Sequence, residues 1–158
     1  CRLLLKQCKE EEISTCVETS GDVSRKAFEC IGDYVDLFLF DYKMSDPENM
    51  KKYTGGNLDR ILDNLIFLCS MGKKVILRCP IIPGINDVEE HFRKIASLAL
   101  ELPLVGVELM PYHSFGKGKW QQVGKRYLLK DLDTVGKEQA QEWNERLNTL
   151  ITEEMLHP

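Results

Sequence analysis

The sequence has no apolar run close to the roughly 20 residues that an α-helix needs to cross a bilayer. It also has no block of like charge, because its 21 basic and 25 acidic residues are interspersed along the chain. These absences argue against a membrane protein and against the basic surface of a nucleic-acid binder. The start of the chain lacks the apolar core and cleavage site of a signal peptide. We therefore expect a soluble protein of the cytoplasm, with neither a membrane nor nucleic acid as its partner.

The six cysteines are scattered, and no CxxC or CxxxCxxC spacing occurs among them. Metal and iron–sulfur sites usually need closely spaced thiolates, so we expect no metal ligands among these cysteines. Cys8 and Cys69 fall in apolar helical runs, whereas Cys16 and Cys79 fall in strand-like runs. Such positions are typical of small buried side chains in a reducing compartment.

A chain of 158 residues, 43% of them hydrophobic, is long enough for one domain with its own core. It begins at Cys1 without a methionine, inside a helical pattern that has no capping residue before it. We therefore expect residues 1–158 to be a piece of a longer protein.

Short β-rich runs alternate with longer helical patterns along the chain. The predicted strands are 14–20, 35–43, 74–82 and 105–112, and the predicted helices are 3–12, 23–32, 58–71, 87–100 and 137–155. Asn57 and Asp87 are expected to cap two of these helices, and Gly72 is expected to end the helix before it. The run "LFLFDY" (37–42) is apolar on both faces, which is typical of a strand covered on both sides.

Strands separated by helices of this length predict right-handed βαβ crossovers and a parallel sheet, an α/β fold. Two architectures stay open at this point, a doubly wound sheet and an arc of a (β/α) barrel. Both place their chemistry at the carboxyl ends of the strands.

Polar side chains stand near the carboxyl ends of all four predicted strands. They are Glu18 and Thr19 on the first strand, Asp41 and Lys43 on the second, Arg78 on the third and His113 after the fourth. Asp41 and Lys43 are two positions apart, so both point to the same face of their strand. An acid beside a base suits a ligand that carries both an ammonium and a carboxylate group. Singly, each residue is explained by an ion pair or a turn, but together they predict a site on one side of the sheet.

Three loops have weaker signals. "YTGGN" (53–57) indicates a flexible approach to a helix, and "IIPGIND" (81–87) indicates a turn that ends a strand. The loop that contains Lys117, Lys119 and Trp120 is long, and loops longer than about 12 residues in compact domains are often functional.

In order and spacing, several segments of residues 3 to 127 resemble the glycyl-radical-enzyme activating enzymes, a family of the radical S-adenosylmethionine superfamily. The segments are "CVETSG", "DLFLFDYK", "KKYTGG" followed by "NLDRILDNL", "VILRCPIIPGIND", and "ELMPYHSFGKGKW" with "VGKRY". Several motifs in one order are more specific than any one of them. The resemblance is to the carboxyl-terminal part of enzymes of the pyruvate formate-lyase activating type.

This resemblance implies a partial (β/α) barrel, of which residues 1–158 would form the carboxyl-terminal part with about four βα units. It also implies S-adenosylmethionine and a [4Fe–4S] cluster as cofactors. The full-length enzyme would take an electron from a donor such as flavodoxin or ferredoxin. It would then abstract a hydrogen atom from a glycine of a glycyl radical enzyme such as pyruvate formate-lyase.

The resemblance also assigns roles by position. Asp41 and Lys43 match an acid and a lysine that line the methionine moiety and a cation, and Arg78 matches an arginine that reaches toward the cofactor. The full cofactor-binding set that the resemblance implies is Glu18, Thr19, Asp41, Lys43, Arg78 and His113. The family's CxxxCxxC cluster loop is expected before Cys1, so residues 1–158 alone are expected to be inactive.

Three alternatives remain open from the sequence. The chain could belong to a radical S-adenosylmethionine enzyme with another substrate, which the substrate loop would distinguish. It could be a cluster-free barrel that binds a nucleotide or an amino acid without catalysis, which the upstream gene sequence would decide. It could also be a purely structural α/β unit, which equilibrium binding of S-adenosylmethionine would test.

A first prediction concerns self-association. If strands that precede Cys1 in a longer protein are missing, the strand at 14–20 is left as an open edge, and such an edge pairs with other chains. Leu3, Leu4 and Leu5 would add an apolar patch. We expect sedimentation at micromolar concentration to show a dimer or aggregate mediated by residues near 1–21. A monomer whose edge strand is protected from hydrogen exchange would contradict this expectation, because the helix at 3–12 would then cover the edge.

Overall fold

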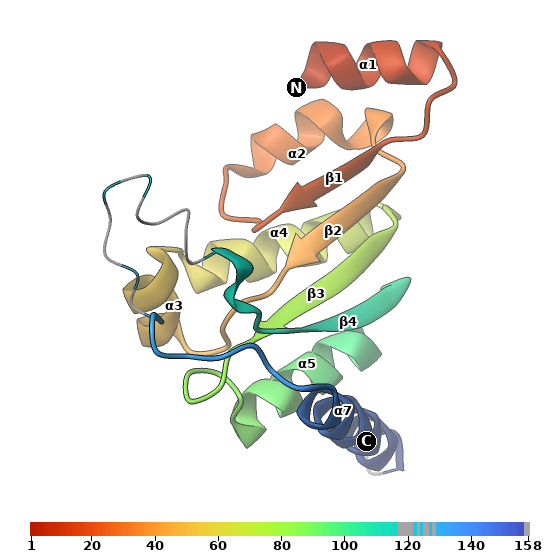
Figure 1. The fold of residues 1–158 in the computed structure, drawn as a ribbon. Coiled ribbons are helices and arrows are strands. Elements are labelled where there is room, and N and C mark those ends of the chain that lie inside the picture. The colour runs from red at the N-terminus through yellow and green to blue at the C-terminus, as the bar shows by residue number, and fades with distance from the viewer. Residues whose placement is uncertain (117–121, 123, 125–126, 128, 157–158) are drawn as a thin grey trace.

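Four parallel strands form a single sheet in the order β1-β2-β3-β4 in the computed structural model, which describes residues 1–116, 122, 124, 127 and 129–156 (Figure 1). The strands are β1 (Cys16–Thr19), β2 (Leu37–Asp41), β3 (Val75–Ile81) and β4 (Gly106–Pro111). All four lie within the predicted ranges, and each pairs with its neighbour in parallel.

Helices connect the strands and follow the last one. They are α1 (Arg2–Glu10), α2 (Arg25–Ile31), α3 (Pro47–Thr54), α4 (Leu58–Ser70), α5 (Glu89–Glu101) and α7 (Lys137–Leu156). Short 3-10 turns lie at Gly32–Tyr34 and Ser114–Gly116. No helix among the described residues is both long and apolar enough to span a bilayer.

The sheet is an arc of a (β/α) barrel and not a doubly wound sheet. Its strand order follows the sequence without a reversal, and a doubly wound sheet requires one. The buried residues of β2 and β3 alternate along the strands and pack with helix residues in one core; examples are Phe38, Phe40, Leu77 and Ile95. Side chains of the opposite face, such as Glu18 and Glu108, are exposed. The expectation that β2 is covered on both faces is wrong, because Leu37 and Leu39 are only half-buried.

Helix α3 was not predicted, although the sequence contains its signals. Pro47 occupies the first turn, where its missing N–H costs nothing. The Asp46 carboxylate accepts a hydrogen bond from the Asn49 amide at 2.6 Å. Gly55 ends the helix with a φ of 74°, in the left-handed region that favours glycine. The segment before "GGN" is therefore a capped helix that carries Tyr53 and Thr54 to the edge of the sheet.

Two of the three predicted helix signals are confirmed. Asn57 caps α4, because its Oδ1 accepts a hydrogen bond from the Arg60 amide at 2.9 Å. Gly72 follows α4 with a φ of 67°. Asp87 does not cap α5: the N-cap residue is Val88, without a side-chain cap. The Asp87 carboxylate instead accepts a hydrogen bond from the Gly84 amide at 2.7 Å, which closes the turn after β3.

The cysteines divide between the core and the surface. Cys69 and Cys79 are buried as predicted, and Cys8 is intermediate. Cys16 was expected to be buried, but it is exposed, because it is in register with Leu37 on the face without helices. The apolar alternation of a short strand does not say which face its helices cover.

The amino-terminal helix α1 lies beside α2, which separates it from the edge strand β1 (Figure 1). Leu5 packs into the core, so it does not contribute to the apolar patch that was expected there. Leu3 and Leu4 are exposed, at 81% and 67%. Self-association through this region stays a prediction.

His91, in the first turn of α5, is an ionisable group in the core, with only 1% of its surface exposed. Its Nδ1 lies 3.0 Å from the Ser45 hydroxyl, and its ring stacks on that of Tyr42 with centroids 5.5 Å apart. Its Nε2 has no hydrogen-bond partner within the described part of the chain. Burial lowers the pKa of His91 to about 4, so the folded protein holds this imidazole neutral.

A second prediction follows from His91. In the unfolded chain a histidine titrates near 6.5, so between about pH 6.5 and pH 4 the unfolded state binds a proton that the folded state does not. The contribution of neutral His91 to the unfolding free energy is full above about pH 6.5 and is lost as the pH falls toward 4. We expect urea unfolding to show a loss of about 2 kcal/mol from pH 7 to pH 5 that is assignable to this group.

The control is His91→Asn, which keeps a polar group near Ser45 and cannot titrate in this range. The variant should lose most of the pH-dependent difference. If it shows the same fall in unfolding free energy as the unaltered chain, another group is responsible.

Candidate functional site

Four of the six predicted residues form a continuous ion-paired cluster at the carboxyl edge of the sheet, which we call the edge cluster: Glu18, Asp41, Lys43 and Arg78. Arg78 donates to Asp41 Oδ1 from Nε at 3.0 Å and from Nη2 at 2.8 Å. Lys43 Nζ donates to the other carboxylate oxygen, Oδ2, at 2.9 Å. Arg78 Nη2 also forms an ion pair with Glu18 Oε1. Asp41 therefore has both of its oxygens engaged by cations.

The register of the sheet explains why these residues meet. Asp41 on β2 is directly opposite Arg78 on β3. Glu18 on β1 is opposite Leu39, which points to the same face of β2 as Asp41 because the two are separated by one residue. The three side chains therefore project from adjacent strands on the face without helices, close to the carboxyl ends.

The edge cluster is partly withdrawn from water. The side chains of Arg78 and Asp41 are 11% and 15% exposed, whereas Glu18 is 62% exposed. Burial by itself would lower the pKa of Arg78, but the hydrogen bonds with Glu18 and Asp41 outweigh it and raise the pKa above its usual value. Arg78 thus stays charged, and two acids balance two bases.

The structure does not bring Thr19 into the edge cluster. Thr19 is opposite Phe40, whose side chain is buried under the helices, so it belongs to the other face of the sheet. Its hydroxyl oxygen accepts a hydrogen bond from the Gly21 amide at 3.1 Å. Thr19 therefore shapes the turn after β1.

His113 lies at the same edge of the sheet, directly after β4, and its side chain is exposed. Its ring is tilted against that of Phe115, with centroids 4.9 Å apart. Among the described residues, no hydrogen bond or ion pair joins it to the edge cluster. His113 therefore lies at the carboxyl edge of the sheet but outside the edge cluster.

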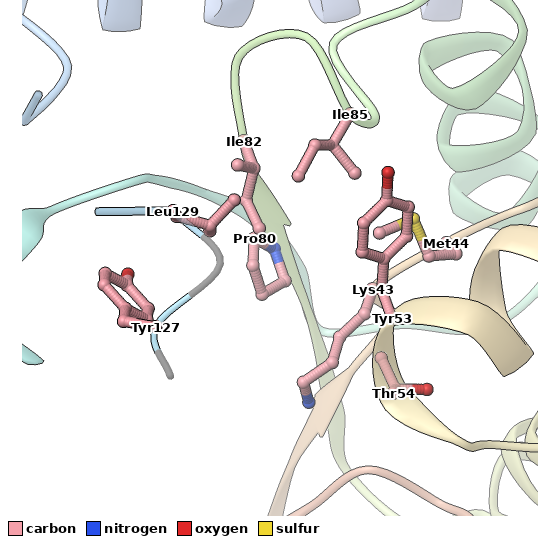
Figure 2. A pocket seen from close by; sticks show the side chains of 9 residues that line it. All are labelled: Lys43, Met44, Tyr53, Thr54, Pro80, Ile82, Ile85, Tyr127 and Leu129. Atoms are coloured by element: carbon pink, nitrogen blue, oxygen red, sulfur yellow. The ribbon is translucent and has the colours of Figure 1, made fainter. Parts of the chain in front are cut away.

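An apolar cavity of about 210 Å³ adjoins the edge cluster (Figure 2). Its walls come from the ends of β2 and β3, from α3 and from the segment before α7. The lining residues are Lys43, Met44, Tyr53, Thr54, Pro80, Ile82, Ile85, Tyr127 and Leu129. Figure 2 shows the Tyr53 ring and Pro80 on opposite sides of the space, with the Lys43 side chain extended below Tyr53. Lys43 therefore belongs both to the cavity and to the edge cluster.

Tyr127 is attached to the end of β4 through a hydrogen bond of 2.7 Å between its hydroxyl and that of Tyr112. Burial, followed by this hydrogen bond, raises the pKa of Tyr127 to about 12. The phenol therefore stays neutral at physiological pH. This pairing places an aromatic side chain from a distant part of the chain on the wall of the cavity.

A second cavity of about 390 Å³ lies next to the first, and more of its lining residues are polar or charged. It is lined by Ser20, Asp22, Asp41, Lys43, Met50, Tyr53, Thr54, Gly56 and Ile61. Asp22 is held by Arg60, whose Nε donates to it at 2.7 Å. The two cavities share Lys43, Tyr53 and Thr54, so Lys43 stands between an apolar space and a polar one.

Several residues of this region were not singled out from the sequence. Tyr53 and Thr54 are on the unpredicted helix α3, and Asn86 is hidden in the turn "IIPGIND". The predicted functional loop with Lys117, Lys119 and Trp120 lies outside the described residues. In the part of the chain that the structure describes, no three Cys, His, Asp or Glu side chains gather as metal ligands.

The fold and the site together define a class. A sequential parallel sheet with a charged, partly buried cluster and a cavity at its carboxyl edge is a partial (β/α) barrel with a candidate small-molecule site. The chain superposes on a domain of pyruvate-formate lyase-activating enzyme from Bacteroides vulgatus with a TM-score of 0.74 and 20% identity, covering 94% of this chain and 84% of that one. It also matches Streptococcus suis SuiB bound to S-adenosylmethionine, with a TM-score of 0.68 and 18% identity over 98% of this chain and 32% of that one. These likenesses establish the fold.

Sequence comparison finds homologues of the chain. The chain is 37% identical to the 4-hydroxyphenylacetate decarboxylase activating enzyme of Clostridioides difficile over 134 residues, 84% of this chain and 42% of the relative. It is 33% identical to the pyruvate formate-lyase-activating enzyme of Clostridium pasteurianum over 149 residues, 94% of this chain and 62% of the relative. No protein-family model matches it. The chain is a homologue of the glycyl-radical-enzyme activating enzymes, as its motifs predicted, and it spans about half the length of these relatives.

A third prediction concerns the stability of the edge cluster. Asp41→Asn removes the charge that both Arg78 and Lys43 contact, and hydrogen bonds to charged groups contribute about 1.5–3 kcal/mol each, so we expect a loss of about 2 kcal/mol in unfolding free energy. Glu18→Gln should cost less than about 1 kcal/mol, because Glu18 is largely exposed. Urea unfolding at pH 7 measures both variants. Equal losses would show that Asp41 is not the centre of the cluster.

Proposed function

We propose that this chain is part of a glycyl-radical-enzyme activating enzyme and forms part of the wall that binds S-adenosylmethionine. The observation that carries the proposal is the edge cluster, which shares Lys43 with an adjacent apolar cavity. The homology of this chain to the activating enzymes supports the same proposal. We also propose that residues 1–158 are the carboxyl-terminal part of a partial-barrel domain.

The residues present match the chemistry of S-adenosylmethionine. Its methionyl end carries an ammonium and a carboxylate, and the edge cluster offers carboxylates for the first and cations for the second. Its adenine is a flat, largely apolar ring, which suits a cavity that contains Tyr53 and Pro80. Lys43 stands where the two ends of such a ligand would join. Thr19 and His113 stay in the proposed cofactor-binding set: Thr19 would act through the turn that it shapes after β1, and His113 from its place directly after β4.

The cysteines of this chain do not match the needs of a [4Fe–4S] cluster. Cys69 and Cys79 are buried in the core, and the described residues contain no group of metal-ligand side chains. When bound, such a cluster supplies the electron that cleaves S-adenosylmethionine. We therefore assign its ligands to residues outside 1–158, and we expect residues 1–158 to bind the cofactor without reacting it.

The proposed substrate is a glycine in the backbone of a glycyl radical enzyme. The relatives are named for different enzymes, including 4-hydroxyphenylacetate decarboxylase, choline trimethylamine-lyase and pyruvate formate-lyase. The proposal is therefore made for the class of partner, with pyruvate formate-lyase as one member. A flavodoxin or ferredoxin is the proposed electron donor, and the enzyme as a whole is an oxidoreductase.

A fourth prediction tests cofactor binding. Isothermal titration of residues 1–158 with S-adenosylmethionine should show one site, and Asp41→Asn should weaken the affinity about tenfold, equivalent to about 1.4 kcal/mol. The reason is that Asp41 holds both cations in place and offers a carboxylate to the ligand.

The matched control is Asp33→Asn. Asp33 also pairs with a lysine, Lys73, at 3.1 Å, but it lies in the 3-10 turn before β2, at the opposite edge of the sheet. This variant should bind like the unaltered chain. If the unaltered chain shows no binding, the proposed function fails for this part of the protein. Equal weakening by both variants would remove Asp41 from the site.

A further inference from the structure

The turn after β3 contains a buried amide side chain, Asn86, with 3% of its surface exposed. Its Nδ2 donates to the Lys43 carbonyl at 2.8 Å and to the Pro80 carbonyl at 2.7 Å. Its Oδ1 accepts a hydrogen bond from the Ile82 amide at 2.7 Å. A single side chain thus connects the segment after β2, the end of β3 and the turn that follows β3.

Pro80 explains why this connection is needed. The ladder between β2 and β3 includes hydrogen bonds from the Phe38 amide to the Lys74 carbonyl and from the Tyr42 amide to the Arg78 carbonyl. Every second residue of β3 therefore directs its backbone N–H and C=O toward β2, and after Arg78 the next such residue is Pro80. Proline has no N–H to donate, so the ladder stops at this point. Beyond this point the side-chain amide of Asn86 joins the two strands, because it donates to a carbonyl just after β2 and to one on β3.

The groups that Asn86 holds belong to the walls of the site. Lys43, Pro80 and Ile82 all line the apolar cavity. Lys43 also lines the polar cavity and pairs with Asp41. The peptide carbonyl of Lys43 is fixed by Asn86, so the position from which the lysine side chain starts depends on that hydrogen bond.

We propose that Asn86 is a positioning residue that sets the place of Lys43 between the two cavities. Without Asn86, the carbonyls of Lys43 and Pro80 lose a shared donor, and the end of β2 separates from the end of β3. The Lys43 ammonium then leaves Asp41 for part of the time. The effect on the lysine follows from the fold alone; only the effect on cofactor affinity rests on the proposed function.

The chain offers a matched control in Asn64, a second buried asparagine, 2% exposed, on α4. Its Nδ2 donates to the carbonyls of Gly21 and Val23, both at 2.8 Å. It therefore fixes the loop after β1 in the same chemical way, but it forms no hydrogen bond with Lys43, Pro80 or Ile82. Replacing Asn64 reports what the loss of a buried asparagine does to the fold in general.

The first experiment measures the lysine directly. Residues 1–158 are labelled with limiting acetic anhydride, and mass spectrometry compares the acetylation rate of Lys43 with that of Lys73. Because a weakened ion pair exposes its amine, Asn86→Ala should raise this ratio about threefold, whereas Asn64→Ala should leave it unchanged. Asn86→Asp, which keeps the acceptor for Ile82 and loses both donated bonds, should raise it at least as much. Asn86→Asp is the test variant if Asn86→Ala does not fold.

The second experiment measures coupling to the ligand. Asn86→Ala should weaken S-adenosylmethionine binding about tenfold in the unaltered chain and by less than about twofold when Lys43 is already replaced by methionine. An equal loss in both backgrounds would overturn a role through Lys43.

The two experiments separate the two proposals. An unchanged acetylation ratio in Asn86→Ala and Asn86→Asp, or an equal rise in Asn64→Ala, overturns the positioning role. A raised ratio in a chain that does not bind S-adenosylmethionine at all supports the positioning role and contradicts the proposed function.

Discussion

The pairing of Asp41 with Arg78 across β2 and β3 is the interaction on which the rest of the candidate site depends. Arg78 is anchored to Asp41 by two hydrogen bonds and reaches Glu18, while Lys43 occupies the second oxygen of the same carboxylate. Both paired side chains are shielded from bulk water, so their attraction is stronger than that of a surface ion pair. Every charged member of the edge cluster is therefore placed by contact with one of these two residues.

The core on the other face of the sheet makes that pairing possible. Phe38 and Phe40 are completely buried under the helices, and they alternate with Leu39 and Asp41 along β2. A shift of β2 by one residue would move the phenylalanines into solvent and Asp41 into the core, at a large cost in free energy. The hydrophobic pattern thus fixes the register, and the register decides which charged groups meet at the carboxyl edge.

The sequence predicted the parts of the fold that follow from local patterns. The four strands, the Asn57 cap and the charged residues at the strand ends are signals that lie within a few neighbouring residues. Helix α3 was not predicted because the sequence interpretation of this region rested on the "YTGGN" motif (53–57). The residues that start the helix, Asp46 and Pro47, lie before that motif. Thr19 and Cys16 could not be assigned to a face before the side covered by helices was known. Asn86 could not be found at all, because its partner Lys43 is 43 residues away and only tertiary structure brings them together.

The edge cluster already balances its own charges, with Glu18 and Asp41 opposite Lys43 and Arg78. A ligand that bound here would therefore exchange partners with four side chains whose charges already cancel, and it would not meet a surface of one sign of charge. A phosphate or another simple anion would occupy the cations and leave two carboxylates without compensation. A zwitterionic ligand would pair with the two cations and with the two carboxylates at the same time. If the proposed function holds, the same balance would make ligand affinity only weakly sensitive to ionic strength, and this edge of the sheet would distinguish ligands by the spacing of their opposite charges and not by their total charge.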